Sequence, residues 1–262
     1  MINLSLDGSV QTLILTLRAR AEEQKQATPL LNDKWSADWY SFMPEDDTLD
    51  DWYNPTFQLA TVIRSSLIDD AVNAFLESRD DALVVELGAG FSTRFFRIGK
   101  DRSTWVELDL EEAIIARRKI DIEVEKHWFI PADMTDTDAW LSLLPQREAE
   151  NIMFVAEGTL MFLEPKKVKA MFDTLAEAYK GAQFVFDVVN PGYINAKNDA
   201  FEALDAPMQW GITPKDLGKY PLSIDDTRFI LLEQNDRWEA IGVDSSKRTE
   251  DRSGYVVAST LG

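Results

Sequence analysis

The sequence predicts an α/β fold built on a mostly parallel sheet, and two features carry that prediction. From residue 82 onward, short apolar runs alternate with helical patterns, which is typical of βαβ units. A turn with two glycines joins the first of these runs to the helix after it. The expected strands are Ala82–Leu87, Thr104–Leu108, His127–Ile130, Asn151–Ala156 and Gln183–Val188, followed by two near Arg228–Glu233 and Gly254–Ser259.

Helices are expected between these strands, near residues 91–99, 111–122, 135–144 and 165–180. The last has the clearest pattern, because Pro165 suits a first helical turn and Gly181 suits a stop. Residues 192–222 interrupt the alternation, and we interpret them as an insertion with short helices around 196–205 and 214–219. With no linker or internal repeat in view, residues 1–262 are expected to form one domain.

The first 80 residues are expected to form a helical N-terminal lid region. Apolar residues recur at helical spacing from Val10 to Ala21, and a further helix is expected over 58–77. Between them, residues 35–57 are rich in aromatic and acidic side chains. These rings either close over a planar substrate or anchor the N-terminal region on the sheet.

The amino-acid composition excludes several classes of site and disfavours some partners. The 262 residues include 46 acidic and 27 basic side chains, a net charge of −19, which disfavours a nucleic-acid partner. The chain has no cysteine and one histidine, His127, so thiol nucleophiles and the usual zinc sites are excluded and no metal is predicted. No apolar run is long enough to span a bilayer, and the start lacks a signal-peptide pattern. We therefore expect a cytoplasmic protein that acts on a small molecule without a membrane.

The glycine turn indicates a nucleoside cofactor. Gly88 and Gly90 follow a buried strand, and Asp109 ends the next strand, where a carboxylate can accept both hydroxyls of a ribose. A dinucleotide site prefers a third glycine, but Thr93 stands there. Glu86 suits the cationic groups of S-adenosylmethionine and would repel a pyrophosphate. S-adenosylmethionine is therefore favoured, with a nicotinamide-dependent oxidoreductase as the alternative.

Acidic residues occur near the carboxyl ends of four successive strands. These are Glu86, Asp109, Asp133 and Glu157. Because the carboxyl ends of parallel strands meet at one edge of a sheet, the four carboxylates are expected to surround one pocket.

Three segments resemble the leucine carboxyl methyltransferase family. Residues 83–97 are similar to its first motif, 105–109 to its second, and 155–165 to its fourth-strand motif. Residues 11–21 and 63–72 resemble the bacterial branch, which includes O-methyltransferases of tetracenomycin-type polyketide synthesis. The resemblance covers roughly residues 10–190. It implies a seven-stranded Rossmann-like methyltransferase sheet with helices on both faces and S-adenosylmethionine across its carboxyl edge.

The resemblance also implies roles for single residues. Gly88 would approach the methionyl part of the cofactor, and Asp109 would bind the ribose. Asp133 and Met134 would lie against the adenine. Glu157 would reach the methionine amino group and Arg64 its carboxylate, with Arg18 or Arg20 as a second basic residue. The family usually has aspartate where this chain has Ser92, so a non-catalytic relative that binds the cofactor stays a third hypothesis.

The predicted reaction is methyl transfer to oxygen. A carboxylate acceptor is already ionised at neutral pH and needs no general base, whereas an alcohol needs one. His127 begins a predicted strand and is interpreted as structural, so the scarcity of bases favours a carboxylate or an acidic hydroxyl. The catalytic residue, the acceptor's identity, the pathway and the oligomeric state are left open by the sequence.

Overall fold

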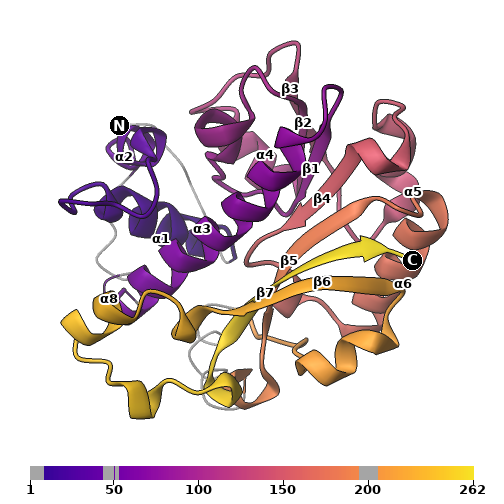
Figure 1. Cartoon of the computed structure of the whole chain (residues 1–262). Helices are drawn as coiled ribbons and strands as arrows, with labels where there is room; N and C mark the ends of the chain where they lie inside the picture. Colours follow the sequence, from indigo (N-terminus) through magenta and orange to yellow (C-terminus); the bar gives the residue numbers. More distant parts are fainter. Residues whose placement is uncertain (1–8, 44–49, 51–52, 195–205) are drawn as a thin grey trace.

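A seven-stranded sheet organises the chain (Figure 1). The computed structural model describes residues 9–43, 50, 53–194 and 206–262. The strand order is β3-β2-β1-β4-β5-β7-β6; the first five strands are parallel, and β7 runs antiparallel to both its neighbours. The strands are β1 Leu83–Leu87, β2 Thr104–Asp109, β3 His127–Pro131, β4 Ile152–Ala156, β5 Gln183–Val189, β6 Leu222–Phe229 and β7 Gly254–Leu261. The predicted fold class is confirmed.

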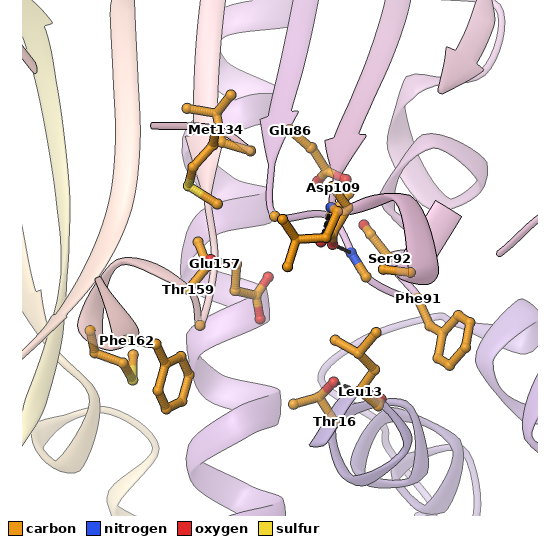
Figure 2. Close-up of a pocket in the computed structure, with 18 of the residues that line it drawn as sticks. Leu13, Thr16, Glu86, Phe91, Ser92, Asp109, Met134, Glu157, Thr159 and Phe162 are labelled. Carbon is orange, nitrogen blue, oxygen red and sulfur yellow. Dashed lines mark hydrogen bonds between the residues drawn. The ribbon is translucent and has the colours of Figure 1, made fainter. Parts of the chain in front are cut away.

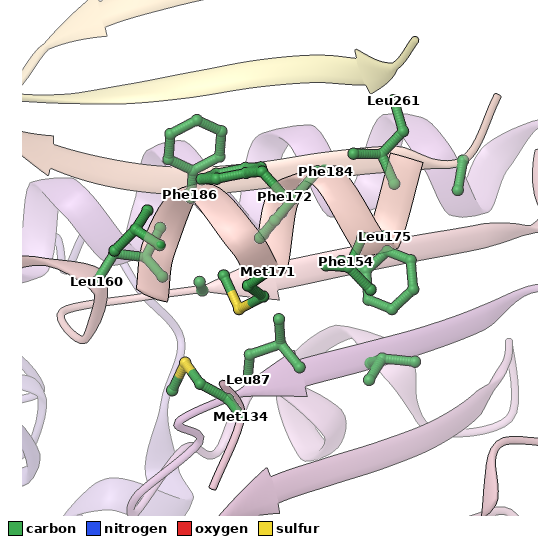
Figure 3. Packing of buried hydrophobic residues seen from close by; sticks show 14 of the residues in the cluster. Leu87, Met134, Phe154, Leu160, Met171, Phe172, Leu175, Phe184, Phe186 and Leu261 are labelled. Atoms are coloured by element: carbon green, nitrogen blue, oxygen red, sulfur yellow. The ribbon is translucent and has the colours of Figure 1, made fainter. Parts of the chain in front are cut away.

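Helices cover both faces of this sheet. Side chains alternate across each strand, so Val85 of β1 packs toward one face while Val84 packs toward the other. On the first face, Phe172 of α6 packs against Phe184 and its neighbours on β5 (Figure 3). On the second face lies α3. The helices are α1 Ser9–Glu23, α2 Lys34–Tyr40, α3 Pro55–Glu77, α4 Glu111–Arg117, α5 Thr137–Trp140, α6 Pro165–Ala178 and α8 Asn235–Ala240.

The two long helices that flank the sheet begin at residues suited to helix starts. In α3 the Asn54 side chain accepts a hydrogen bond from the Phe57 N–H, and Pro55 occupies the first turn. In α6 Pro165 stands in the first turn, as predicted. None of the helices in the described ranges is both long and apolar enough to cross a membrane.

Some predicted boundaries are wrong. We expected a strand near Arg228–Glu233, but β6 ends at Phe229 and residues 230–232 form a 3₁₀ turn. The strand was placed on the apolar run Ile230-Leu231-Leu232, but β6 is a largely exposed edge strand and contains no such run. The expected helix over 91–99 is a single π-helical turn, Phe95–Gly99, and α4 ends five residues early.

The N-terminal helices lie together beside the strand ends. Leu17 of α1, Trp39 of α2 and Phe91 after β1 belong to one buried cluster. The expected short helix at 214–219 is present as a 3₁₀ helix, whereas the one expected around 196–205 lies outside the described residues.

Candidate cofactor and acceptor site

A cavity of about 580 Å³ opens at the carboxyl ends of β1 to β4 (Figure 2). Loops after the four strands supply one wall, and α1 and α3 supply the other, through residues such as Leu13, Thr16 and Arg64. All eight residues predicted to bind the cofactor line this cavity: Arg64, Glu86, Gly88, Gly90, Asp109, Asp133, Met134 and Glu157. The strand ends, together with α3, therefore bring the predicted residues to one place.

The turn after β1 requires its two glycines. Gly88 and Gly90 have φ angles of +68° and +51°, which residues with a Cβ atom rarely adopt. A Cβ atom on Gly88 would lie 2.5 Å from Thr159 Oγ1, and one on Gly90 would lie 2.7 Å from Leu13 Cδ2. The backbone here is consequently packed between the β4 loop and α1.

Asp109 holds this turn through its carboxylate. Oδ2 accepts a hydrogen bond from the Gly90 N–H and Oδ1 accepts one from the Leu110 N–H, each at 2.7 Å. Burial raises the pKa of Asp109, and these two hydrogen bonds oppose the rise. Each oxygen has further acceptor capacity, so the side chain can take hydroxyl donors from a ligand in the cavity.

The residues after β3 place a carboxylate next to an apolar side chain. Asp133 is exposed, and its Oδ1 accepts hydrogen bonds from the N–H and hydroxyl of Thr135 at 2.8 Å each. Met134 is buried and approaches Gly88. A carboxylate beside an apolar thioether can recognise one polar edge of a flat ring.

Glu157 lies at the centre of a buried ionic network. Its carboxylate accepts hydrogen bonds from Ser65 Oγ at 2.6 Å, from Arg64 Nε at 3.2 Å, and from Arg94. Burial raises the pKa of Glu157, but the charges of Arg94 and Arg64 outweigh burial and leave the pKa well below its ordinary value. Glu157 is therefore ionised throughout the neutral range.

Arg94 connects the network to Glu86. Its guanidinium is buried and pairs with Asp69, Glu86 and Glu157. Glu86 was expected to face a cationic ligand directly, but the residue is only 2% exposed and its carboxylate is bound to Arg94. Arg94 is thus a site residue that the predicted set omitted.

The N-terminal helices add further charges. Arg20, rather than Arg18, lines the cavity, and its Nη2 donates to the Phe91 carbonyl at 2.7 Å. Arg18 instead pairs with Asp50. Next to Ser92, the Thr93 hydroxyl donates to the buried carboxylate of Asp33 at 2.6 Å.

The aromatic segment mainly anchors the N-terminal region. The rings of Trp35 and Trp39 contact Phe96, with centroids 4.6 and 5.7 Å from its ring. Phe57 lines the cavity, so one ring of the segment reaches the site. Trp52 lies outside the described residues.

The sole histidine of the chain is structural, as predicted. His127 is fully buried, its Nε2 lies 2.9 Å from Glu107, and its ring stacks on Phe95. It does not line the cavity.

The sequence of the chain is similar to those of known methyltransferases. A sequence model of the family described as leucine carboxyl methyltransferase matches residues 14–176. The chain is 27% identical over 210 residues to the tetracenomycin polyketide synthesis O-methyltransferase TcmP of Streptomyces glaucescens, covering 79% of this chain and 76% of that one. It is 26% identical over 190 residues to the S-adenosyl-L-methionine-dependent methyltransferase dpfgK of Gibberella zeae, covering 67% and 63%.

Solved structures show the same fold. Magnesium protoporphyrin IX methyltransferase (ChlM) of Synechocystis PCC 6803, with bound SAH, superposes with a TM-score of 0.52 at 13% identity, covering 88% of this chain and 96% of that one. An S-adenosylmethionine-dependent methyltransferase of Mesorhizobium loti gives a TM-score of 0.52 at 17% identity, covering 73% and 96%.

Proposed function

Because the chain belongs to the leucine carboxyl methyltransferase family of S-adenosylmethionine-dependent enzymes, as its strand-end motifs predicted, we propose that it methylates an oxygen of a small organic acceptor. The acceptor class we propose is a carboxylate or an acidic hydroxyl on an apolar, polyketide-like body. The observation that carries this proposal is the composition of the strand-end cavity.

The residues of the cavity fit the cofactor. We propose that Asp109 binds the ribose hydroxyls, that Asp133 and Met134 lie against the adenine, and that the Gly88 turn admits the methionyl part. The volume of the cavity, about 580 Å³, lies within the range found for small-molecule binding sites. The carboxylate of Asp109, oriented by the Gly90 N–H, suits a diol donor.

The charged network suits the amino-acid end of the cofactor. We propose that Glu157 receives the amino group and Arg64 the carboxylate. Both line the cavity and already lie 3.2 Å apart, so they present adjacent charges of opposite sign to a zwitterion. Glu86 contributes by holding Arg94 rather than by facing the ligand alone.

We propose that the acceptor brings its own ionised oxygen. Among the lining residues that the structure describes, none is a histidine, lysine, tyrosine or cysteine. The carboxylates there belong to residues at the strand ends and the start of α4: Glu86, Asp109, Glu112, Asp133 and Glu157. An alcohol would require a general base, whereas a carboxylate or acidic phenol requires none at neutral pH.

The chain's own part in the reaction is to hold and desolvate the acceptor. When bound, S-adenosylmethionine supplies an electrophilic methyl group on its sulfonium. Apolar residues that line the cavity provide a surface for the acceptor: Leu13, Phe57, Met161, Phe162, Ala206 and Pro207. Such a wall excludes water from the acceptor oxygen and fixes its approach, and orientation alone can supply roughly 7–11 kcal/mol of the barrier.

A binding and turnover experiment tests the proposal. Purified protein is titrated calorimetrically with S-adenosylmethionine and with NADH, then incubated with labelled methyl donor and matched panels of aromatic carboxylic acids, acidic phenols and aliphatic alcohols. We expect binding of the methyl donor but not of NADH, and labelled esters or aryl ethers but no alkyl ethers. Donor binding with no product from any panel would favour a non-catalytic relative, and methylated alcohols would overturn the acceptor class.

A further inference from the structure

The glycine turn of the cofactor site is held from behind by a buried arginine. Arg117 of α4 is fully buried and is not among the residues that line the cavity. Its Nη1 nevertheless donates a hydrogen bond to the Gly90 carbonyl at 2.9 Å. It is therefore placed to affect a ligand only through the turn.

Both the N–H and the carbonyl group of Gly90 form hydrogen bonds with side chains. Its N–H donates to Asp109 Oδ2 at 2.7 Å, while its carbonyl accepts from Arg117. Glycine can adopt many backbone conformations, and Gly90 has a φ angle of +51°. The two hydrogen bonds therefore select the conformation in which the Gly90 N–H points toward Asp109. The next carbonyl, of Phe91, accepts from Arg20 at 2.7 Å. Two arginines from different helices thus fix consecutive peptide groups.

The rest of the Arg117 side chain is fixed by its own partners. Its Nη2 lies 2.9 Å from Glu107 of β2, and its Nε donates to Asp121 at 3.0 Å. The ring of Trp39 covers the guanidinium, whose Cζ lies 4.5 Å from the ring centroid. A guanidinium satisfied on three sides is a rigid support, unlike a solvated surface arginine.

We propose that Arg117 is a positioning residue for cofactor binding: it holds the Gly90 carbonyl so that the Gly90 N–H orients the Asp109 carboxylate toward the ribose hydroxyls. This inference rests on the proposed role of the cavity as the S-adenosylmethionine site. Because Arg117 acts on the unliganded turn, its contribution is preorganisation, which reduces the conformational entropy lost when the ligand binds.

The test compares Arg117→Met with Arg248→Met. Arg248 is also buried and paired, with Asn235 and Glu239, but does not line the cavity, so its substitution reproduces the loss of a buried guanidinium. We expect Arg117→Met to raise the Kd and KM for S-adenosylmethionine by about 5- to 30-fold, the value of one hydrogen bond of about 1–2 kcal/mol, with kcat unchanged. Arg248→Met is expected to stay within about twofold of wild type.

A double-mutant cycle with Asp109→Ala separates positioning from general destabilisation. If Arg117 acts through Asp109, Arg117→Met changes the Kd by less than about twofold once Asp109 is alanine. An unchanged Kd in Arg117→Met, or the same fold-loss with and without Asp109, would overturn the inference. Failure of the wild-type protein to bind S-adenosylmethionine would instead overturn the proposed function.

A second pair of variants keeps the test valid if Arg117→Met does not fold. That substitution leaves the buried Glu107 carboxylate without its guanidinium, which is strongly destabilising. The same Kd measurements are therefore made on Glu107→Gln/Arg117→Met against Glu107→Gln alone. These two proteins differ in the Arg117 contacts with Asp121 and with the Gly90 carbonyl, and only the second reaches the cofactor turn. The comparison is therefore expected to give the same 5- to 30-fold loss, about 1–2 kcal/mol.

Discussion

Replacement of Asp109 by alanine should weaken S-adenosylmethionine binding without unfolding the protein. In the structure both carboxylate oxygens accept backbone N–H groups at 2.7 Å, from Gly90 and Leu110, which fixes their direction. We expect the remaining acceptor capacity of the two oxygens to receive the ribose diol. The substitution therefore removes the ligand's partner and also the anchor of the glycine turn.

The size of the loss follows from the kind of bond removed. Hydrogen bonds to charged groups contribute roughly 1.5–3 kcal/mol each, and water replaces part of what is lost in the variant. Taking one such bond as the net effect, Asp109→Ala should raise the Kd by about 10- to 150-fold. Asp109→Asn keeps an acceptor oxygen but loses the charge, so an intermediate Kd is expected.

Isothermal titration calorimetry measures this effect, with thermal unfolding as the check on folding. Asp173→Ala is the matched control, because Asp173 is an exposed carboxylate on α6 that pairs with Lys169 and lies outside the cavity. A folded Asp109→Ala protein whose Kd stays within about twofold of the Asp173→Ala value would refute the ribose assignment.

Three further outcomes are expected. Burial raises the pKa of Asp109 above its ordinary value of 3.8, and we expect the ionised form to bind the ribose. The affinity for S-adenosylmethionine should therefore begin to fall at a pH above 3.8 as the pH is lowered, and Asp109→Asn should flatten this pH profile. In urea unfolding, Arg94→Met should lose roughly 3–5 kcal/mol and the exposed Arg118→Met less than about 1 kcal/mol, since Arg94 neutralises three carboxylates. Phe162→Ala should raise the acceptor KM at least about fivefold, through lost apolar burial, with donor Kd unchanged.

The cavity could be predicted from sequence because two local signals agreed. The short, mostly apolar run of β1, which is buried along its whole length, and the glycine turn after it are local properties, and parallel strands bring their carboxyl ends together. Glu86, Asp109, Asp133 and Glu157 therefore line one cavity although up to 71 residues separate them. The edge strand β6 was misplaced because its partly exposed residues lack an apolar pattern.

Apart from Arg64, which the family resemblance indicated, the arginines of the site could not be assigned in the same way. Arg20 and Asp33 come from N-terminal elements whose docking on the sheet depends on tertiary packing, such as that of Trp39 against Phe96. Arg94 and Arg97 lie within the first motif, three residues apart, but nothing in their spacing showed that both would be buried against Asp69. Their burial follows from the carboxylates that surround them.

The charge balance of this network leads to one more prediction. At the end of the cavity where we propose the methionyl group binds, the described side chains of the network carry four positive and five negative charges. The arginines are Arg20, Arg64, Arg94 and Arg97, and the carboxylates are Asp33, Asp69, Glu86, Glu157 and Asp187. S-adenosylmethionine carries one positive charge more than its demethylated product. An excess negative charge in a buried network attracts the sulfonium of the donor and has no such effect on the neutral thioether of the product, so the methyl donor should bind more tightly than the product.

Loss of one carboxylate from the network tests this reasoning. Asp69 pairs with Arg94 and Arg97 but does not line the cavity, so Asp69→Asn changes the charge without removing a ligand contact. The variant should bind S-adenosylmethionine more weakly and its product about equally well, because the product lacks the sulfonium charge. High salt should reduce the preference only slightly, since the network is buried. Equal affinities of the wild-type protein for the two compounds, or a ratio that Asp69→Asn leaves unchanged, would show that the excess carboxylate does not act on the sulfonium.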